Sequence, residues 1–252
     1  ASRSNFLATH QPLIRGIEEL RDEINANAEL KKLIQHKFKI KCTTGYGINS
    51  FVDFVDPFDI IKHLMIGSEG TLGFITEITY KTVIEHTHKA SALMIFPDMN
   101  SACLAVMKLD RDLVAAAELM DRASLRSVED EPGMPGYLKT LDDEATALLV
   151  EVRTETKDDL TSLIEAVKER LASIPTVLPI TFTDVKYEYE KLWYIRKGIF
   201  PAVGGMRTPG TTVLIEDVAC PKDRLAEAIL ELRAIMDKYS YTDGIIYGHA
   251  LD

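Results

Sequence analysis

The sequence predicts an α+β protein whose larger part is a ferredoxin-like layer, in which helices cover one face of an antiparallel sheet. Three observations support this prediction. Apolar residues recur at three- and four-residue steps in several segments, as they do in helices. Beyond residue 88, a strand, helix, strand pattern occurs twice. Finally, 46% hydrophobic and 27% charged residues in a chain of 252 are close to the average of globular proteins.

The first 87 residues are predicted to form one domain that starts with helices and ends with a strand. Apolar residues in helical spacing place two helices, at 13–24 and at 30–34. From Ile66 a glycine-rich loop leads into a β-rich run at 74–83, which we expect to be a strand. A polar patch follows at 85–89, so the domain boundary is predicted near residue 88.

Residues 88–252 are predicted to form the second domain. Its first unit is a strand, a helix capped by Asn100, and a strand, expected at 90–96, 100–113 and 115–120. Its second unit has the same order, expected at 145–152, 158–173 and 176–183. A helix, a strand, a long helix started by Pro221 and a last strand follow, expected at 184–199, 211–218, 221–236 and 244–247.

Charge and cysteine content exclude several classes of protein. The net charge of −10 would repel a phosphate backbone, so nucleic acid is not an expected partner. The three cysteines have no zinc, redox or iron–sulfur spacing, which fits a reducing compartment. No apolar run approaches the ~18 residues that a membrane span needs, so we expect a soluble, cytoplasmic protein.

A glycine-punctuated loop is the first candidate for chemistry. Glycines at 67, 70 and 73 allow positive φ and close approach of a ligand to the backbone, while Ser68 and Thr71 add hydroxyl groups. The spacing is neither that of a P-loop nor that of a dinucleotide-binding turn. By spacing alone, an ordinary tight loop and a phosphate- or ring-binding loop both remain open.

Specific strings in the chain resemble one flavoprotein family. Gly45-Tyr46-Gly47-Ile48-Asn49 and the later run from Ile66 to Glu77 resemble the end of a PCMH-type FAD-binding domain in FAD-linked oxidases of the vanillyl-alcohol oxidase superfamily. The rest resembles the cap domain of the D-2-hydroxy-acid dehydrogenases in that group, of the D-lactate and D-2-hydroxyglutarate dehydrogenase type. The strings that carry this second likeness are Glu118-Leu119-Met120-Asp121, Leu192–Gly198, Glu216-Asp217-Val218 and Gly248–Asp252.

The resemblance implies a reaction and a set of site residues. A D-2-hydroxy acid would be oxidised to the 2-keto acid by hydride transfer to FAD. Arg196 matches the arginine that grips a carboxylate, and His249 matches the first histidine of a motif that binds a divalent metal, zinc or manganese, or acts as a base. The implied FAD-binding residues are Thr44, Gly45, Tyr46, Gly67, Ser68, Glu69, Gly70, Thr71, Gly73 and Ile75.

Residue chemistry by itself leaves alternatives open at each position. Arg196 suits bidentate carboxylate binding, but it would equally serve in a rim salt bridge on a surface helix. His249 suits metal binding or proton transfer, and a lone histidine at a strand end is also often structural. Glu216 and Asp217 would assist a metal, orient Arg196 or lie at a solvent-facing strand end.

The family pattern also predicts what surrounds the chain. It would continue beyond Asp252 with Gly-Asn-x-His, and it has a glycine-rich pyrophosphate loop before the FAD residues, so we expect a fragment of a longer enzyme. Electrons would leave by a separate acceptor, such as an iron–sulfur domain of the parent chain. Any association of the enzyme with a membrane would be through that acceptor. The rival hypothesis is a non-catalytic ferredoxin-like module that binds a small metabolite or docks a partner.

Overall fold

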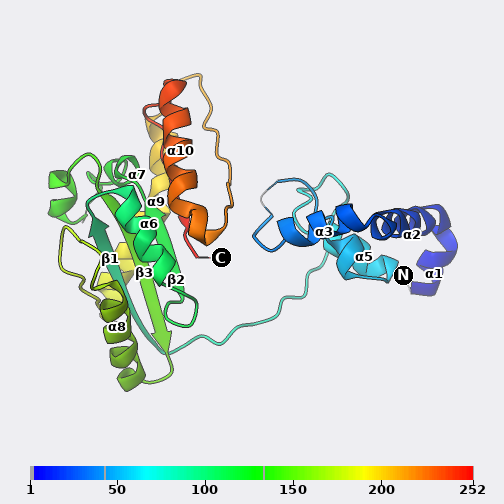
Figure 1. Ribbon diagram of the computed structural model, residues 1–252, viewed down its shortest axis with the longest axis horizontal. Coiled ribbons are helices and arrows are strands. Elements are labelled where there is room, and N and C mark those ends of the chain that lie inside the picture. The colour runs from blue at the N-terminus through cyan, green and yellow to red at the C-terminus, as the bar shows by residue number, and fades with distance from the viewer. Residues whose placement is uncertain (1–2, 43, 133, 252) are drawn as a thin grey trace. The chain divides into compact units, whose positions relative to one another are not determined.

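The computed structural model describes residues 3–42, 44–132 and 134–251, and it divides the chain into two compact units (Figure 1). The N-terminal unit runs to Thr82 and includes the short stretch Glu216–Ala219. The sheet unit comprises Val83–Ile215 and the residues from Cys220 onward. In the described part of the chain, no helix is long and apolar enough to cross a membrane.

Helices form most of the regular structure in the N-terminal unit. They are α1 (Arg3–Thr9), α2 (Gln11–Ala26), α3 (Ala28–Lys37), α4 (Ser50–Asp53) and α5 (Pro57–Leu64). The two predicted helices are confirmed as α2 and α3, and the Asn27 side chain caps α3 by accepting from Leu30 N at 3.0 Å. A small core of Ile17, Phe51, Ile60 and Leu64 joins α2, α4 and α5.

The strand predicted at 74–83 is wrong. The described residues 74–86 contain no helix or strand, and their large apolar side chains are exposed, Phe74 to 89%. The β propensity of the segment is genuine, but a strand needs a neighbouring strand to pair its backbone N–H and C=O groups. No described strand forms β-sheet hydrogen bonds with residues 74–83.

Four strands form the sheet of the second unit, and every neighbouring pair is antiparallel. They are β1 (His88–Phe96), β2 (Ala116–Met120), β3 (Thr146–Thr154) and β4 (Tyr247–His249), in the order β1-β3-β2-β4. The α+β class and the first three strands are thereby confirmed. The last strand begins three residues later than the predicted start at Gly244.

Two other predicted strands are wrong. Residues 176–183 run along the edge of β1 but make only an isolated bridge, between Thr183 and Ser91, besides a bond from Val177 N to Ile95 O. Pro179 lies in the middle of this run and has no N–H to donate, which prevents a continuous ladder. Residues 211–218, all described, contain no strand either.

Helices cover both faces of the sheet, which corrects the predicted one-sided layer (Figure 1). One face packs against α6 (Met99–Lys108), α8 (Lys157–Leu171) and α10 (Leu225–Lys238), and the other against α7 (Arg122–Arg126) and α9 (Lys186–Met206). The reason lies in β1 and β3, whose side chains are apolar on both sides. Met94 and Val150 face the first set of helices, whereas Ile95 and Leu149 face the second.

Helix boundaries in this unit follow the capping chemistry. The predicted cap at Asn100 is wrong, because Asp98 caps α6 by accepting from Ser101 N at 2.7 Å. The helix also ends at Lys108 rather than near residue 113. Pro221 precedes a short 3₁₀ turn, Lys222–Arg224, and only then does α10 begin.

Candidate functional site

A polar cluster occupies the sheet face that α9 covers. Glu118 on β2 pairs directly with His249 on β4, and Met120 pairs with Tyr247 two residues along. Because side chains alternate along a strand, Glu118, His249 and Tyr247 all point to the same face. Arg196 reaches them from α9, the helix on which the sequence places it. We call Glu118, Arg196, Tyr247 and His249 the arginine–histidine site.

Glu118 joins the other members of this site. Its Oε2 accepts from Arg196 Nε at 2.9 Å, and its Oε1 lies 2.5 Å from His249 Nδ1. The guanidinium carbon of Arg196 lies 4.5 Å from the centre of the Tyr247 ring, a cation–π distance. The site therefore holds its arginine from two sides, by a carboxylate and by an aromatic face.

Exposure differs sharply among these side chains. Glu118 is 4% exposed, Arg196 is 20% exposed and His249 is 66% exposed. A buried carboxylate is stable only when it is paired, and here an arginine provides the pairing. The exposed edges of Arg196 and His249 then remain available to a ligand that approaches from solvent.

The arrangement can bind an anion and move a proton. In the described chain, the terminal nitrogens of Arg196 make no hydrogen bond or ion pair, so they can donate to a carboxylate in the bidentate manner of guanidinium groups. His249 Nε2 is likewise without a described partner. A ligand carboxylate and a neighbouring hydroxyl could thus be engaged by two adjacent side chains.

A second buried carboxylate lies on the same face, on β3. Glu151 forms an ion pair with Arg153 and lies 3.4 Å from the Ser91 hydroxyl, which in turn accepts from Trp193 Nε1 at 3.1 Å. Glu151, Arg153 and Trp193, with Lys197, line a shallow hollow of about 450 Å³ between the strand and α9. Trp193 is thus fixed to the sheet one helical turn from Arg196.

The predicted flavin-binding residues all lie in the N-terminal unit. Tyr46 and Thr71 hydroxyls are 2.9 Å apart, so the structure brings the 44–46 segment to the 67–73 loop. The Thr71 hydroxyl donates to Ser68 O at 2.6 Å, and the Ser68 hydroxyl donates to Met65 O, just before the loop, at 2.9 Å. The loop is therefore partly held by its own hydroxyl groups.

Glycine is required at several of these positions. Gly45, Gly67 and Gly70 have φ between 74° and 78°, where other residues are strained, and each faces open space where a Cβ would stand. Glu69 also takes a positive φ of 50°. Gly73 lies against the Met65 side chain, and Ile75 is half-exposed. The backbone is therefore uncovered at Gly45, Gly67 and Gly70.

Glu216 and Asp217 are not the partners of Arg196. Glu216 and Asp217 belong to the short stretch Glu216–Ala219 of the N-terminal unit, where Asp217 Oδ2 lies 3.0 Å from Lys41 Nζ. The carboxylate partner of Arg196 is Glu118. The sequence contains Glu118 in a recognisable string, but we assigned it no role. The one feature of the sequence that could have pointed to Glu118 is a charged residue between Ala117 and Leu119 in a strand predicted to be buried.

The described residues contain no group of three or more histidine, cysteine, aspartate or glutamate side chains that could hold a metal. His249 has one such neighbour, Glu118, whose charge already serves Arg196. Asp252, the last residue of this sequence that matches the histidine motif, lies outside the described residues. The residues present do not by themselves make a metal centre.

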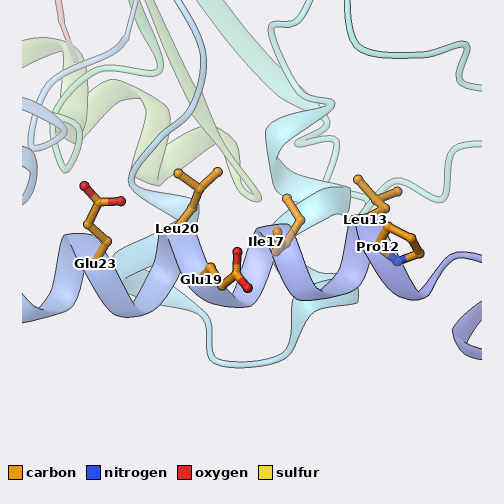
Figure 2. Close-up of a pocket in the computed structure, with 7 residues that line it drawn as sticks. Pro12, Leu13, Ile17, Glu19, Leu20 and Glu23 are labelled. Atoms are coloured by element: carbon orange, nitrogen blue, oxygen red, sulfur yellow. The ribbon is translucent and has the colours of Figure 1, made fainter.

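A different hollow lies on α2 and has no such chemistry. It measures about 420 Å³ and is lined mainly by apolar side chains such as Leu13, Ile17 and Leu20, with Glu19 and Glu23 beside them (Figure 2). None of the predicted cofactor or substrate residues lines it.

Comparison with known proteins identifies the sheet unit. Residues 85–252 match the family described as "FAD linked oxidases, C-terminal domain". The chain is 30% identical over 194 residues to "D-lactate dehydrogenase [cytochrome], mitochondrial" of Arabidopsis thaliana, which covers 76% of this chain and 32% of that protein. It is 24% identical over 202 residues to "Glycolate oxidase subunit GlcD" of Bacillus subtilis, covering 79% of this chain and 40% of that protein.

A third relative is "D-lactate dehydrogenase" of Anaerostipes hadrus, 24% identical over 198 residues, or 76% of this chain and 40% of that protein. The chain thus spans only 32% to 40% of the length of these relatives. The family match covers the whole sheet with both of its helical layers and the arginine–histidine site. The chain therefore belongs to the FAD-linked oxidase family, whose C-terminal domain it contains.

Proposed function

We propose that the chain is part of an FAD-dependent dehydrogenase that oxidises a D-2-hydroxy acid to the 2-keto acid. The sheet unit would be the substrate-binding cap domain, predicted at 88–252. The N-terminal unit would be the end of a PCMH-type FAD-binding domain, predicted at 1–87. The observation that carries the proposal is Arg196, whose guanidinium is held by Glu118 and Tyr247 with its terminal nitrogens free.

A fixed arginine beside an exposed histidine suits a 2-hydroxy acid. Such a substrate carries a carboxylate and, on the adjacent carbon, the hydroxyl that loses its proton. In the proposal Arg196 binds the carboxylate through its two terminal nitrogens. His249, a neighbour of the same glutamate, then lies within reach of the hydroxyl. Two relatives are named for D-lactate and one for glycolate, and both compounds are 2-hydroxy acids.

The reaction divides between the cofactor and this chain. FAD, when bound, supplies the acceptor for the hydride that leaves the substrate α-carbon. His249 takes the hydroxyl proton at Nε2, so that the C–O single bond becomes the carbonyl of the 2-keto acid. Arg196 holds the carboxylate and so orients the α-carbon, with its hydrogen, toward the cofactor. The Tyr46–Thr71 loop, with its bare glycine backbone, is where the N-terminal unit would hold FAD.

The ferredoxin-like description of the sheet also belongs to the proposal. The order β1-β3-β2, with residues 176–183 bridged to the free edge of β1, is the arrangement expected for a split βαβ unit. The helices α7 and α9 on the second face, together with β4, would be additions that build the site.

A comparison of substrates tests the proposal. The FAD-loaded full-length enzyme that contains this chain is supplied with a dye as electron acceptor and with D-lactate, L-lactate, glycolate, D-2-hydroxyglutarate or 1,2-propanediol. We expect oxidation of D-2-hydroxy acids and none of 1,2-propanediol, which has the hydroxyl but lacks the carboxylate that Arg196 would bind. Equal rates with 1,2-propanediol and D-lactate would refute the assigned role of Arg196.

A further inference from the structure

We propose that Arg233 and Asp121 are positioning residues that hold β4 in the register that places Tyr247 against Arg196. We call these two residues the β4 clamp. The inference rests on the proposed function, because it concerns the arginine that would bind the substrate carboxylate. It adds to that function two residues that touch neither substrate nor cofactor.

The strand β4 has little of its own to fix its register. It comprises three residues and, among the described strands, it pairs with β2 alone. The chain that leads into it from α10, residues 239–246, has turns but no helix or strand. Because side chains alternate along a strand, a slip of one residue would turn Tyr247 away from the sheet face that α9 covers.

Asp121 holds the residue just before β4. Its Oδ2 accepts from Ile246 N at 2.9 Å, and its own backbone N–H donates to Ile246 O at 3.0 Å. Its Oδ1 accepts from Ser124 N at 2.8 Å and from the Ser124 hydroxyl. The Asp121 side chain is only 9% exposed, so it cannot turn without breaking a buried hydrogen bond. The position of Ile246 relative to β2 is thereby fixed.

Arg233 ties the same point to α10. One terminal nitrogen of its guanidinium donates to Asp121 Oδ2, and the other donates to Gly244 O at 2.9 Å. The rigid fork of the guanidinium thus holds the carboxylate and the approaching chain together. Since α10 packs on the sheet face opposite to Tyr247, the clamp connects that helix to the strand that carries the site.

The register that the clamp sets decides what lies beside Arg196. Tyr247 follows Ile246 and pairs with Met120, and its ring centre is 4.5 Å from the guanidinium carbon of Arg196. Glu118 holds Arg196 through Nε, and one hydrogen bond leaves the plane of the guanidinium free to turn. The Tyr247 ring restricts that plane, which keeps the two terminal nitrogens in the orientation in which they would meet a carboxylate.

The experiment removes the arginine of the clamp in the FAD-loaded full-length enzyme that contains this chain. Arg233→Met keeps most of the side-chain length but cannot donate to either acceptor. Arg224→Met is the matched control, because Arg224 lies just before α10 and forms an exposed ion pair with Glu227. Hydrogen–deuterium exchange, measured by mass spectrometry on peptides that cover 244–251, follows the strand. Steady-state kinetics with D-lactate follows the site.

We expect residues 244–251 to exchange faster in Arg233→Met than in the unmodified enzyme or in Arg224→Met, while β1 and β3 exchange as before. The value of kcat/KM should fall by about 2- to 30-fold, the range that a cation–π contact is worth, and Tyr247→Leu should cause a similar fall. Because both changes act through one contact, the double variant should be no slower than Tyr247→Leu alone.

A clamp that is only structural predicts a different result, in which the losses of Arg233→Met and Tyr247→Leu multiply. That outcome, or unchanged exchange of 244–251 in Arg233→Met, would overturn the inference. If Arg233→Met fails to fold, Arg233→Lys decides, since it keeps the charge and reaches only one of the two acceptors. It should give exchange faster than the unmodified enzyme, and equal exchange would overturn the inference.

Failure of the proposed function gives a separate result. If the unmodified enzyme oxidised no 2-hydroxy acid, the function would be wrong, whereas faster exchange confined to 244–251 in Arg233→Met would still support the clamp. Immediate exchange of 244–251 in the unmodified enzyme would overturn the clamp whatever the substrate.

Discussion

Replacement of Arg196 by lysine should weaken the enzyme against every 2-hydroxy acid. The guanidinium donates to Glu118 through Nε at 2.9 Å and still offers two parallel donors to a ligand. A lysine ammonium is a single point charge. If it contacts Glu118, it cannot also present a planar pair of donors to a carboxylate, and it does not reproduce the flat contact of the guanidinium with Tyr247.

The size of the effect follows from these contacts. The loss of one charge-assisted hydrogen bond to the substrate costs about 1.5–3 kcal/mol. Because each 1.36 kcal/mol is tenfold in rate, we expect kcat/KM to fall by about 10- to 150-fold. The loss should be similar for D-lactate and glycolate, since both present the same carboxylate to Arg196.

The assay is steady-state kinetics of the FAD-loaded full-length enzyme that contains this chain, with a dye acceptor. Arg224→Lys is the matched control, because Arg224 forms an exposed ion pair with Glu227 and has no place in the site. A thermal unfolding curve of each variant separates catalytic loss from misfolding. Unchanged kcat/KM for all 2-hydroxy acids in Arg196→Lys would assign Arg196 to structure alone and would refute the reasoning.

Three further predictions concern stability, reactivity and association. Asp121→Ala should lower the free energy of unfolding in urea by about 2–4 kcal/mol, because it removes a buried carboxylate that accepts from Ser124 N and Ile246 N and pairs with the partly exposed Arg233. Asp130→Ala, at an exposed pair, should change it little, and equal costs would contradict this. Burial raises the pKa of Cys103 from 9.0 to about 12, so a thiol reagent at pH 8 should modify exposed Cys42 and spare Cys103 until the protein unfolds. The folded state holds the Cys103 thiol proton more tightly than the unfolded state, so the contribution of this group to the free energy of unfolding is complete below pH 9 and is lost as the pH rises toward 12. Urea unfolding at pH 8 and at pH 10.5 should show this loss. Fast labelling of Cys103 in the native protein would refute the burial argument. Phe74→Glu should reduce self-association measured by sedimentation velocity, because an exposed apolar β-prone segment promotes edge pairing, and no change would rule the segment out as its cause.

Elements with a strong local pattern were predictable from the sequence. The helices α2, α3, α8 and α10 show apolar residues at helical spacing, and β1, β2 and β3 are short apolar runs between turn signals. These signals depend on neighbours only a few residues away, so a single sequence contains them. The sequence also contains the motif residues Arg196 and His249, although it cannot state what they contact.

The failures share one physical cause. The segments 74–83 and 211–218 have strand-like composition but no strand in the described chain, because a strand exists only where a second strand supplies hydrogen bonds. The covering of the second sheet face by α9 was missed for a related reason. The two faces of β1 carry alternate apolar side chains. Whether helices cover one face of the sheet or both is decided by tertiary packing, not by the sequence of β1.

The site itself shows most clearly what only tertiary structure decides. Glu118 and His249 are far apart in the sequence, and they meet because β2 and β4 pair in a register that sets them opposite each other. Arg196 completes the site because α9 lies across that face of the sheet. The sequence by itself determined which side chains could bind an anion or carry a proton. The strand register and the helix packing determined that one buried carboxylate holds both, since such contacts depend on distances that no local pattern encodes.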